Sequence, residues 1–219
     1  VSAYFRVMLA DAERWEAIAD AMLERMGEHG LLRARHASYL AVLYDERGDK
    51  VGAAELHRRS IALNRQIGAA PFTIAAGLNN LAVALGNSGR EDEAIAAYEE
   101  ALATYREVVG EQHPNYATTL DNLATAHAAR GDLDTALRLH LDALQRREAL
   151  IDASHPSLGV TLGNLAELYL ERGEPELALP YAERAVAITR TALGDRHPLA
   201  LGCEVGLAHA YAGRGDLTQ

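Results

Sequence analysis

The feature that most constrains this 219-residue sequence is a repeat with a period of 42 residues. The pattern Leu-x-Asn-Leu-Ala occurs at residues 78–82, 120–124 and 162–166. Each block is followed by a glycine, at positions 89, 131 and 173, and then by two spaced alanines. His-Pro pairs open the units at positions 113, 155 and 197. A fixed period of this length indicates a solenoid, in which one small unit of secondary structure stacks on copies of itself.

Within each unit the pattern predicts two helices. In the third unit, Pro114 stands where a first helical turn tolerates proline, and apolar residues then recur at helical spacing. We expect Gly131 to end this helix in a left-handed conformation and Asp132 to cap the next one, which runs to about Leu150. Alanines such as Ala82 are expected where the helices cross closely.

The predicted domain organisation is an N-terminal helix, partial repeat or cap in residues 1–30, with Ala10–Met26 as its amphipathic helix, and an array in residues 31–219. Four full repeats are expected near 33–70, 75–112, 114–154 and 156–196, with a half repeat at 198–215. Because the sequence does not begin with methionine and stops within a unit, we expect it to belong to a longer protein.

Composition excludes several classes of partner and location. The net charge is −10, and no basic run offsets it, so neither nucleic acid nor an anionic membrane surface is expected as a partner. Cys203 is the only cysteine, which rules out an intrachain disulfide. The sequence contains no apolar stretch of membrane-spanning length and does not begin as a secretory signal, so a cytoplasmic protein is expected.

The Asn-Leu-Ala block, the glycine and the spaced alanines resemble the tetratricopeptide repeat, in the 42-residue variant found in kinesin light chain and its bacterial relatives. The resemblance covers roughly residues 31–215. It implies an all-α fold, a right-handed α-solenoid of helical hairpins, whose first helices line a concave groove that binds peptides or extended protein segments. It also implies a place in a larger bacterial signalling or regulatory protein.

The resemblance further implies which residues face the groove. Asn80, Asn122 and Asn164 are the strongest candidates, because an amide can both donate to and accept from a peptide backbone. The alternative is that each amide ties neighbouring helices together. The remaining candidates by the same register are Arg35, Asn79, Val83, Asn87, Asp121, Thr125 and Glu167.

The charge of the expected groove bears on its partner. Acidic residues predominate there, with Arg35 as the exception, so we expect a neutral or basic segment rather than an acidic carboxyl-terminal tail. The alternative is that these acids are ordinary solvated residues. The family's asparagine is replaced by Tyr39 in the first unit and by Gly206 in the last, which concentrates the expected binding on the middle of the array.

No catalytic, cofactor or metal motif is present in the sequence. His113, His155 and His197 recur only once per unit, which favours a linker or capping role over metal binding. His127 and His140 lie on apolar stripes and are expected to be packed. The sequence therefore predicts a non-catalytic interaction module without a cofactor, and the alternative function is self-assembly through the exposed ends of the solenoid.

Overall fold

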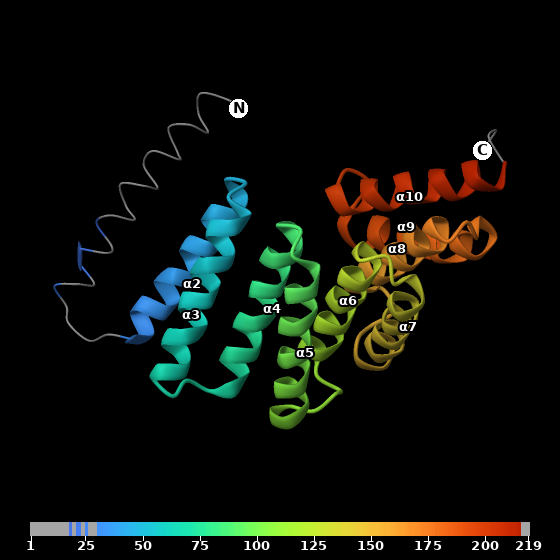
Figure 1. Ribbon diagram of the computed structural model, residues 1–219. Helices are drawn as coiled ribbons and strands as arrows, with labels where there is room; N and C mark the ends of the chain where they lie inside the picture. Colours follow the sequence, from blue (N-terminus) through green and yellow to red (C-terminus); the bar gives the residue numbers. More distant parts are fainter. Residues whose placement is uncertain (1–17, 19–20, 23–24, 26–29, 216–219) are drawn as a thin grey trace.

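The computed structural model describes residues 18, 21–22, 25 and 30–215. Within these residues the chain forms α-helices joined by short turns, and no strand is present (Figure 1). The helices are α2 (Gly30–Glu46), α3 (Lys50–Gln66), α4 (Pro71–Asn87), α5 (Glu91–Val108), α6 (Pro114–Ala129), α7 (Leu133–Leu150), α8 (Pro156–Glu171), α9 (Pro175–Leu193) and α10 (Pro198–Arg214). The expected all-α solenoid is confirmed, whereas the predicted helix Ala10–Met26 lies largely outside the described residues.

The helices form consecutive antiparallel pairs, α2 with α3 through α8 with α9, and α10 packs against both α8 and α9. First helices of successive units also contact one another: α4 with α6, α6 with α8, and α8 with α10. Second helices of the described units approach one another less closely than this. The array therefore curves toward its first helices, and Figure 1 shows the helix axes turning progressively from α2 to α10.

The repeated His-Pro pairs are helix starts. In each pair the histidine is the N-cap residue and its Nδ1 accepts a hydrogen bond from the backbone N–H two residues later, while the proline occupies the first helical position. A proline there removes only an N–H that has no partner within the helix. At the turn inside the third unit, Gly131 has φ 87° and the Asp132 side chain accepts from the N–H of Thr135, as expected. The sequence thus sets these helix ends locally.

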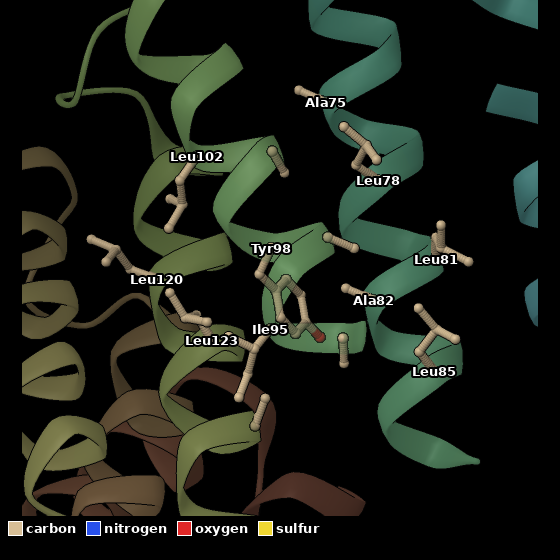
Figure 2. Close-up of a cluster of buried hydrophobic side chains, with 14 of the residues drawn as sticks. Ala75, Leu78, Leu81, Ala82, Leu85, Ile95, Tyr98, Leu102, Leu120 and Leu123 are labelled. Carbon is tan, nitrogen blue, oxygen red and sulfur yellow. The ribbon is translucent and has the colours of Figure 1, made fainter. Parts of the chain in front are cut away.

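Small side chains sit where the two helices of a unit cross. In the second unit Ala82, Ala94 and Ala101 are completely buried, and the matching alanines of the third and fourth units are buried too. Leucines and an aromatic ring fill the space on either side of the crossing, as with Leu81 and Tyr98 in Figure 2. A larger side chain at the crossing would push the helices apart, which costs about 1–3 kcal/mol in a well-packed core.

Two helical glycines of the C-terminal units should respond oppositely to the same substitution. A Cβ at Gly159 would overlap the Cγ2 of the fully buried Thr189, whereas a Cβ at Gly202 would meet nothing within 4 Å. We expect Gly159→Ala to lower the free energy of unfolding by about 1–3 kcal/mol. Gly202→Ala should raise it by about 0.5–1 kcal/mol, because glycine disfavours helix interiors. Urea unfolding followed by circular dichroism measures both, and equal shifts would contradict this packing.

Candidate functional site

The residues expected in the groove lie on the first helices α2, α4, α6 and α8 and differ in exposure. Asn122 and Asn164 are half-buried. The exposed ones are Arg35, Asn80, Val83, Asn87, Thr125 and Glu167. In α2, Tyr39 stands at the position of the asparagine and is 68% exposed, so the first unit offers an aromatic ring instead of an amide. The sequence showed this replacement, but only the structure shows that the ring is open to solvent.

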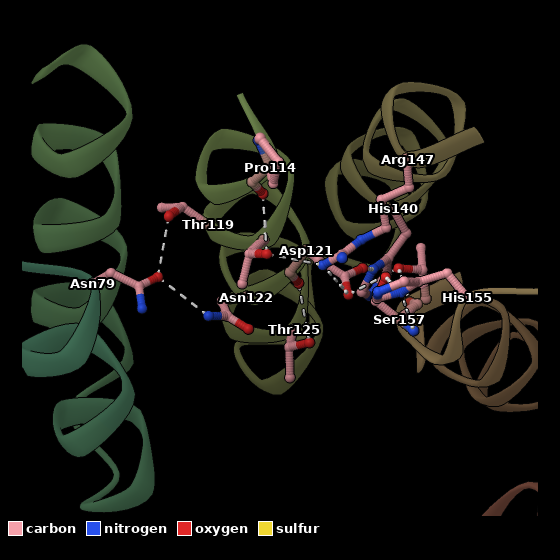
Figure 3. Close-up of polar contacts among 12 residues, drawn as sticks. Asn79, Pro114, Thr119, Asp121, Asn122, Thr125, His140, Arg147, His155 and Ser157 are labelled. Atoms are coloured by element: carbon pink, nitrogen blue, oxygen red, sulfur yellow. Dashed lines mark hydrogen bonds and ion pairs between the residues drawn. The ribbon is translucent and has the colours of Figure 1, made fainter. Parts of the chain in front are cut away.

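Asn79 joins α4 to α6 and does not present a free amide to the groove. Its Oδ1 accepts hydrogen bonds from Thr119 Oγ1 at 3.1 Å and from Asn122 Nδ2 at 3.2 Å (Figure 3). For Asn122 the structure thus contains the helix-tying bond that the sequence left open as an alternative, and Asn79 is its acceptor. The side-chain amide of Asn164, in contrast, has no hydrogen bond among the described residues.

Asp121 is not exposed on the groove as expected from its register; its side chain is buried, and the residue is 3% exposed. Its Oδ1 is 2.6 Å from Nδ1 of His140, and its Oδ2 accepts from Thr161 Oγ1 at 3.1 Å (Figure 3). Since a carboxylate only accepts, the ring nitrogen of His140 donates. Asp121 therefore ties three helices, α6, α7 and α8, and this buried position corrects the expected one.

Arg147 completes this buried polar cluster from α7. Its guanidinium lies 3.9 Å from Asp121 Oδ2 and donates from Nη2 to Thr118 Oγ1 at 3.2 Å. Burial lowers the pKa of the Arg147 guanidinium, and the nearby Asp121 carboxylate opposes that shift. Arg147 follows His140 by seven residues and so lies on the same apolar face of α7. A charged residue on such a face is the signal that a buried partner exists.

The ties between units recur with the repeat. Thr119 donates to Asn79, and Thr161 donates to Asp121, so each hydroxyl reaches the oxygen 40 residues earlier on the preceding first helix. At the next junction the corresponding positions hold Cys203 and Gly163. Only a long contact, Cys203 Sγ to the Gly159 carbonyl at 4.0 Å, remains there. The polar tie is thus missing between α8 and α10.

Two cavities open on the inner surface on either side of α8, and Asn164 and Glu167 border both. The first, of about 180 Å³, lies between α6 and α8 and has Thr125, His140 and Glu171 among its lining residues. The second, also of about 180 Å³, lies between α8 and α10. Its lining includes Val160, Gly163, Leu199, Gly202, Cys203 and Gly206. Burial raises the pKa of the Cys203 thiol, so this thiol is not poised as a nucleophile.

Comparison with known proteins agrees with this geometry. The sequence family described as tetratricopeptide repeat matches residues 73–149, 121–191 and 157–219. The chain belongs to this family. No curated protein matches the sequence.

Solved structures identify the type of repeat. A crystal structure from Podosopora anserina, described as a kinesin light chain with nearly identical TPR-like repeats, superposes with a TM-score of 0.71 at 27% identity, covering 86% of this chain and 89% of that one. A single-substitution variant of it gives the same values. BtubC (BKLC) from P. vanneervenii superposes with a TM-score of 0.78 at 24% identity, covering 99% of this chain and 86% of that one. The tetratricopeptide repeats here are kinesin-light-chain-like.

The described part of the tetratricopeptide array holds no group of three or more His, Cys, Asp or Glu side chains that could bind a metal ion. The histidines of the His-Pro pairs instead cap helices, and His127 and His140 are buried. Among the described helices, none combines the length and apolar character that crossing a bilayer requires.

The Asp121 cluster should matter for stability. Replacing Asp121 by Ala leaves Thr161 and His140 buried without their common acceptor and Arg147 without its ion-pair partner, and we expect a loss of about 3 kcal/mol in the free energy of unfolding. Asp134→Ala on α7 is the matched control, because that carboxylate is 91% exposed and its ion pair with Arg172 should contribute little. Urea unfolding of both variants tests this, and equal losses would show that the cluster does not hold the units together.

Proposed function

We propose that this chain is a non-catalytic module that binds an extended segment of a partner protein along the inner surface of its first helices. Tetratricopeptide repeats form protein–protein interaction scaffolds, and their fold is typically non-catalytic. The observation that carries the proposal is the pair of cavities beside α8, which share Asn164 and Glu167 and continue the surface that holds Asn80, Val83 and Thr125.

A neutral or basic segment suits this surface best. Glu167 and Glu171 on α8 are exposed and form no ion pair among the described residues, whereas Glu174 just beyond the helix is paired with Arg172. Complementary charge favours the encounter with a basic partner and disfavours an acidic one. The acidic side chains on the inner surface are therefore expected to determine which partners bind more than how tightly they bind.

A cross-linking experiment tests the groove itself. A photoreactive benzoylphenylalanine at Val83 or Thr125, both exposed on first helices, should yield adducts with the partner in extracts of the source cells. The same residue at Ala103, exposed on the second helix α5, is the control and should yield none. Adducts at Ala103 alone would place the interaction on the outer surface and contradict the proposal.

Two asparagine substitutions separate binding from folding. The side-chain amide of Asn164 has no hydrogen bond within the described protein. Asn164→Ala should therefore weaken partner binding about fivefold, equivalent to about 1 kcal/mol, with little change in melting temperature. Asn79 accepts two hydrogen bonds between helices, so Asn79→Ala should instead lower stability by about 1–2 kcal/mol. Calorimetry with the cross-linked partner and thermal melting give the two readouts. The reverse pattern would assign the binding contact to Asn79 and the structural role to Asn164, and would contradict these roles.

Self-assembly is a second candidate, favoured by one observation. Leu201 and Val205 on α10 are 47% and 56% exposed, and they lie on the last described helix of the array. Apolar side chains at an open end of a solenoid can pair between copies. Sedimentation across a concentration series measures this, and a concentration-independent monomer that is unchanged by Val205→Asp would remove it.

The wider context expected from the family resemblance is part of the same proposal. In this proposal the module belongs to a larger bacterial signalling or regulatory protein in the cytoplasm, and it recognises that protein's partner.

A further inference from the structure

The two cavities beside α8 differ in chemistry. The acidic cavity lies between α6 and α8. Its polar lining residues are Thr125, His140, Asn164, Glu167 and Glu171, and its apolar ones are Ala128, Ala129 and Leu168. The glycine cavity lies between α8 and α10. Its walls include Gly163, Gly202 and Gly206, with Val160 and Leu199 as apolar residues. The two share Asn164 and Glu167 and are therefore adjacent along the inner surface.

The acidic cavity has unused polar groups at both its rim and its floor. Glu167 and Glu171, at the rim, have no ion-pair partner among the described residues. His140 is 2% exposed, and Asp121 holds its Nδ1, so Nε2 is the ring nitrogen left for a ligand. Nearly all of this histidine is enclosed by protein, yet it lines the cavity. In the neutral ring that donates from Nδ1, Nε2 is an acceptor, and an acceptor beside two carboxylates suits a cation that also donates hydrogen bonds.

That cation is a side chain rather than a metal ion. Two carboxylates and one imidazole do not form a group able to hold a metal in the described protein. The guanidinium of Arg or the ammonium of Lys, in contrast, brings several donors on a long stem and fits a cavity of about 180 Å³ that is open to the groove.

The glycine cavity exists because the tie between units is missing there. Gly163 and Cys203 replace the oxygen and hydroxyl that join the preceding first helices. Gly202 and Gly206 lie inside α10, where glycine disfavours a helix, yet a Cβ at either would meet nothing within 4 Å. Packing within the described protein therefore does not require glycine at these two positions, and the space they leave is lined mainly by apolar groups.

We propose that this module recognises an extended partner segment that carries a basic residue, Arg or Lys, and a nearby aliphatic residue. The basic side chain enters the acidic cavity, and the aliphatic side chain enters the glycine cavity. In an extended segment, alternate side chains point the same way and lie about 7 Å apart, so two residues of one short segment can reach adjacent cavities. This inference rests on the proposed function and names the chemistry of its partner.

The test is a selection from a random library of 12-residue displayed peptides on the intact protein. Enriched peptides should contain Arg or Lys together with Val, Leu or Ile at one preferred separation. Synthetic copies are then measured by fluorescence polarisation against two variants. Glu167→Gln with Glu171→Gln removes the rim charges, and Gly206→Leu fills the glycine cavity. Each should weaken binding at least tenfold, and the loss with the Gln variant should shrink as salt is raised.

Matched controls separate these effects from general charge or folding. Glu99→Gln with Glu107→Gln makes the same charge change on exposed residues of α5, and Ala187→Leu makes a comparable addition on the exposed side of α9. Both should bind within twofold of the unsubstituted protein. Circular dichroism must show all variants folded; if Gly206→Leu is not, Gly202→Val replaces it.

Other outcomes overturn the inference. Enrichment of acidic peptides, no enrichment at all, or binding that survives either cavity substitution would each do so. The proposed function is judged separately by cross-linking at Val83, which lines neither cavity, so its adducts do not depend on the partner's charge. Adducts there combined with a failed selection would keep the groove and reject this partner chemistry.

Discussion

The array depends on how one unit is joined to the next, because a tetratricopeptide unit cannot bury its apolar surface alone. Apolar packing supplies most of this joint, and in the third and fourth units a threonine hydroxyl adds a directional bond to an oxygen 40 residues earlier. The acceptor is a neutral amide in Asn79 and a buried carboxylate in Asp121. A charge buried this deeply needs more partners than an amide does, which explains why His140 and Arg147 gather around Asp121.

The same joint decides where the inner surface is open. Between α4 and α6 the side-chain amide of Asn122 donates a hydrogen bond to Asn79, so these two amides bond to each other within the protein. Between α8 and α10 the residues in register are Gly163 and Cys203, and a cavity takes the place of the bond. The two cavities therefore lie toward the C-terminal units, beside α8, whereas the asparagines of the sequence concentrate the expected binding on the middle of the array.

Much of the fold follows from local sequence. A period that repeats Asn-Leu-Ala, glycine and two alanines predicts paired helices, and Pro114, Gly131 and Asp132 set the ends of those helices by their own backbone and side-chain chemistry. The candidate site could be predicted less well from the sequence. Register alone assigns Asn79, Asn122 and Asp121 to the same inner surface, but whether a polar side chain there faces solvent or the next helix depends on residues 40 positions away. The prediction that Asp121 faces the groove was wrong for this reason.

A single sequence does not show which distant residues pair with each other, but it does show which residues need a buried partner. His140 and Arg147 interrupt the apolar stripe of α7, and such residues need buried partners to offset the loss of water. Conversely, Gly202 and Gly206 weaken α10 without relieving any contact within the described protein. A polar residue on an inward stripe indicates an internal tie, whereas helical glycines with open space before them indicate room for something outside the chain. Along the first helices of the array, the polar ties between units reach α8, and the glycines with open space beside them lie in α10. The two cavities lie on either side of α8, between these two regions.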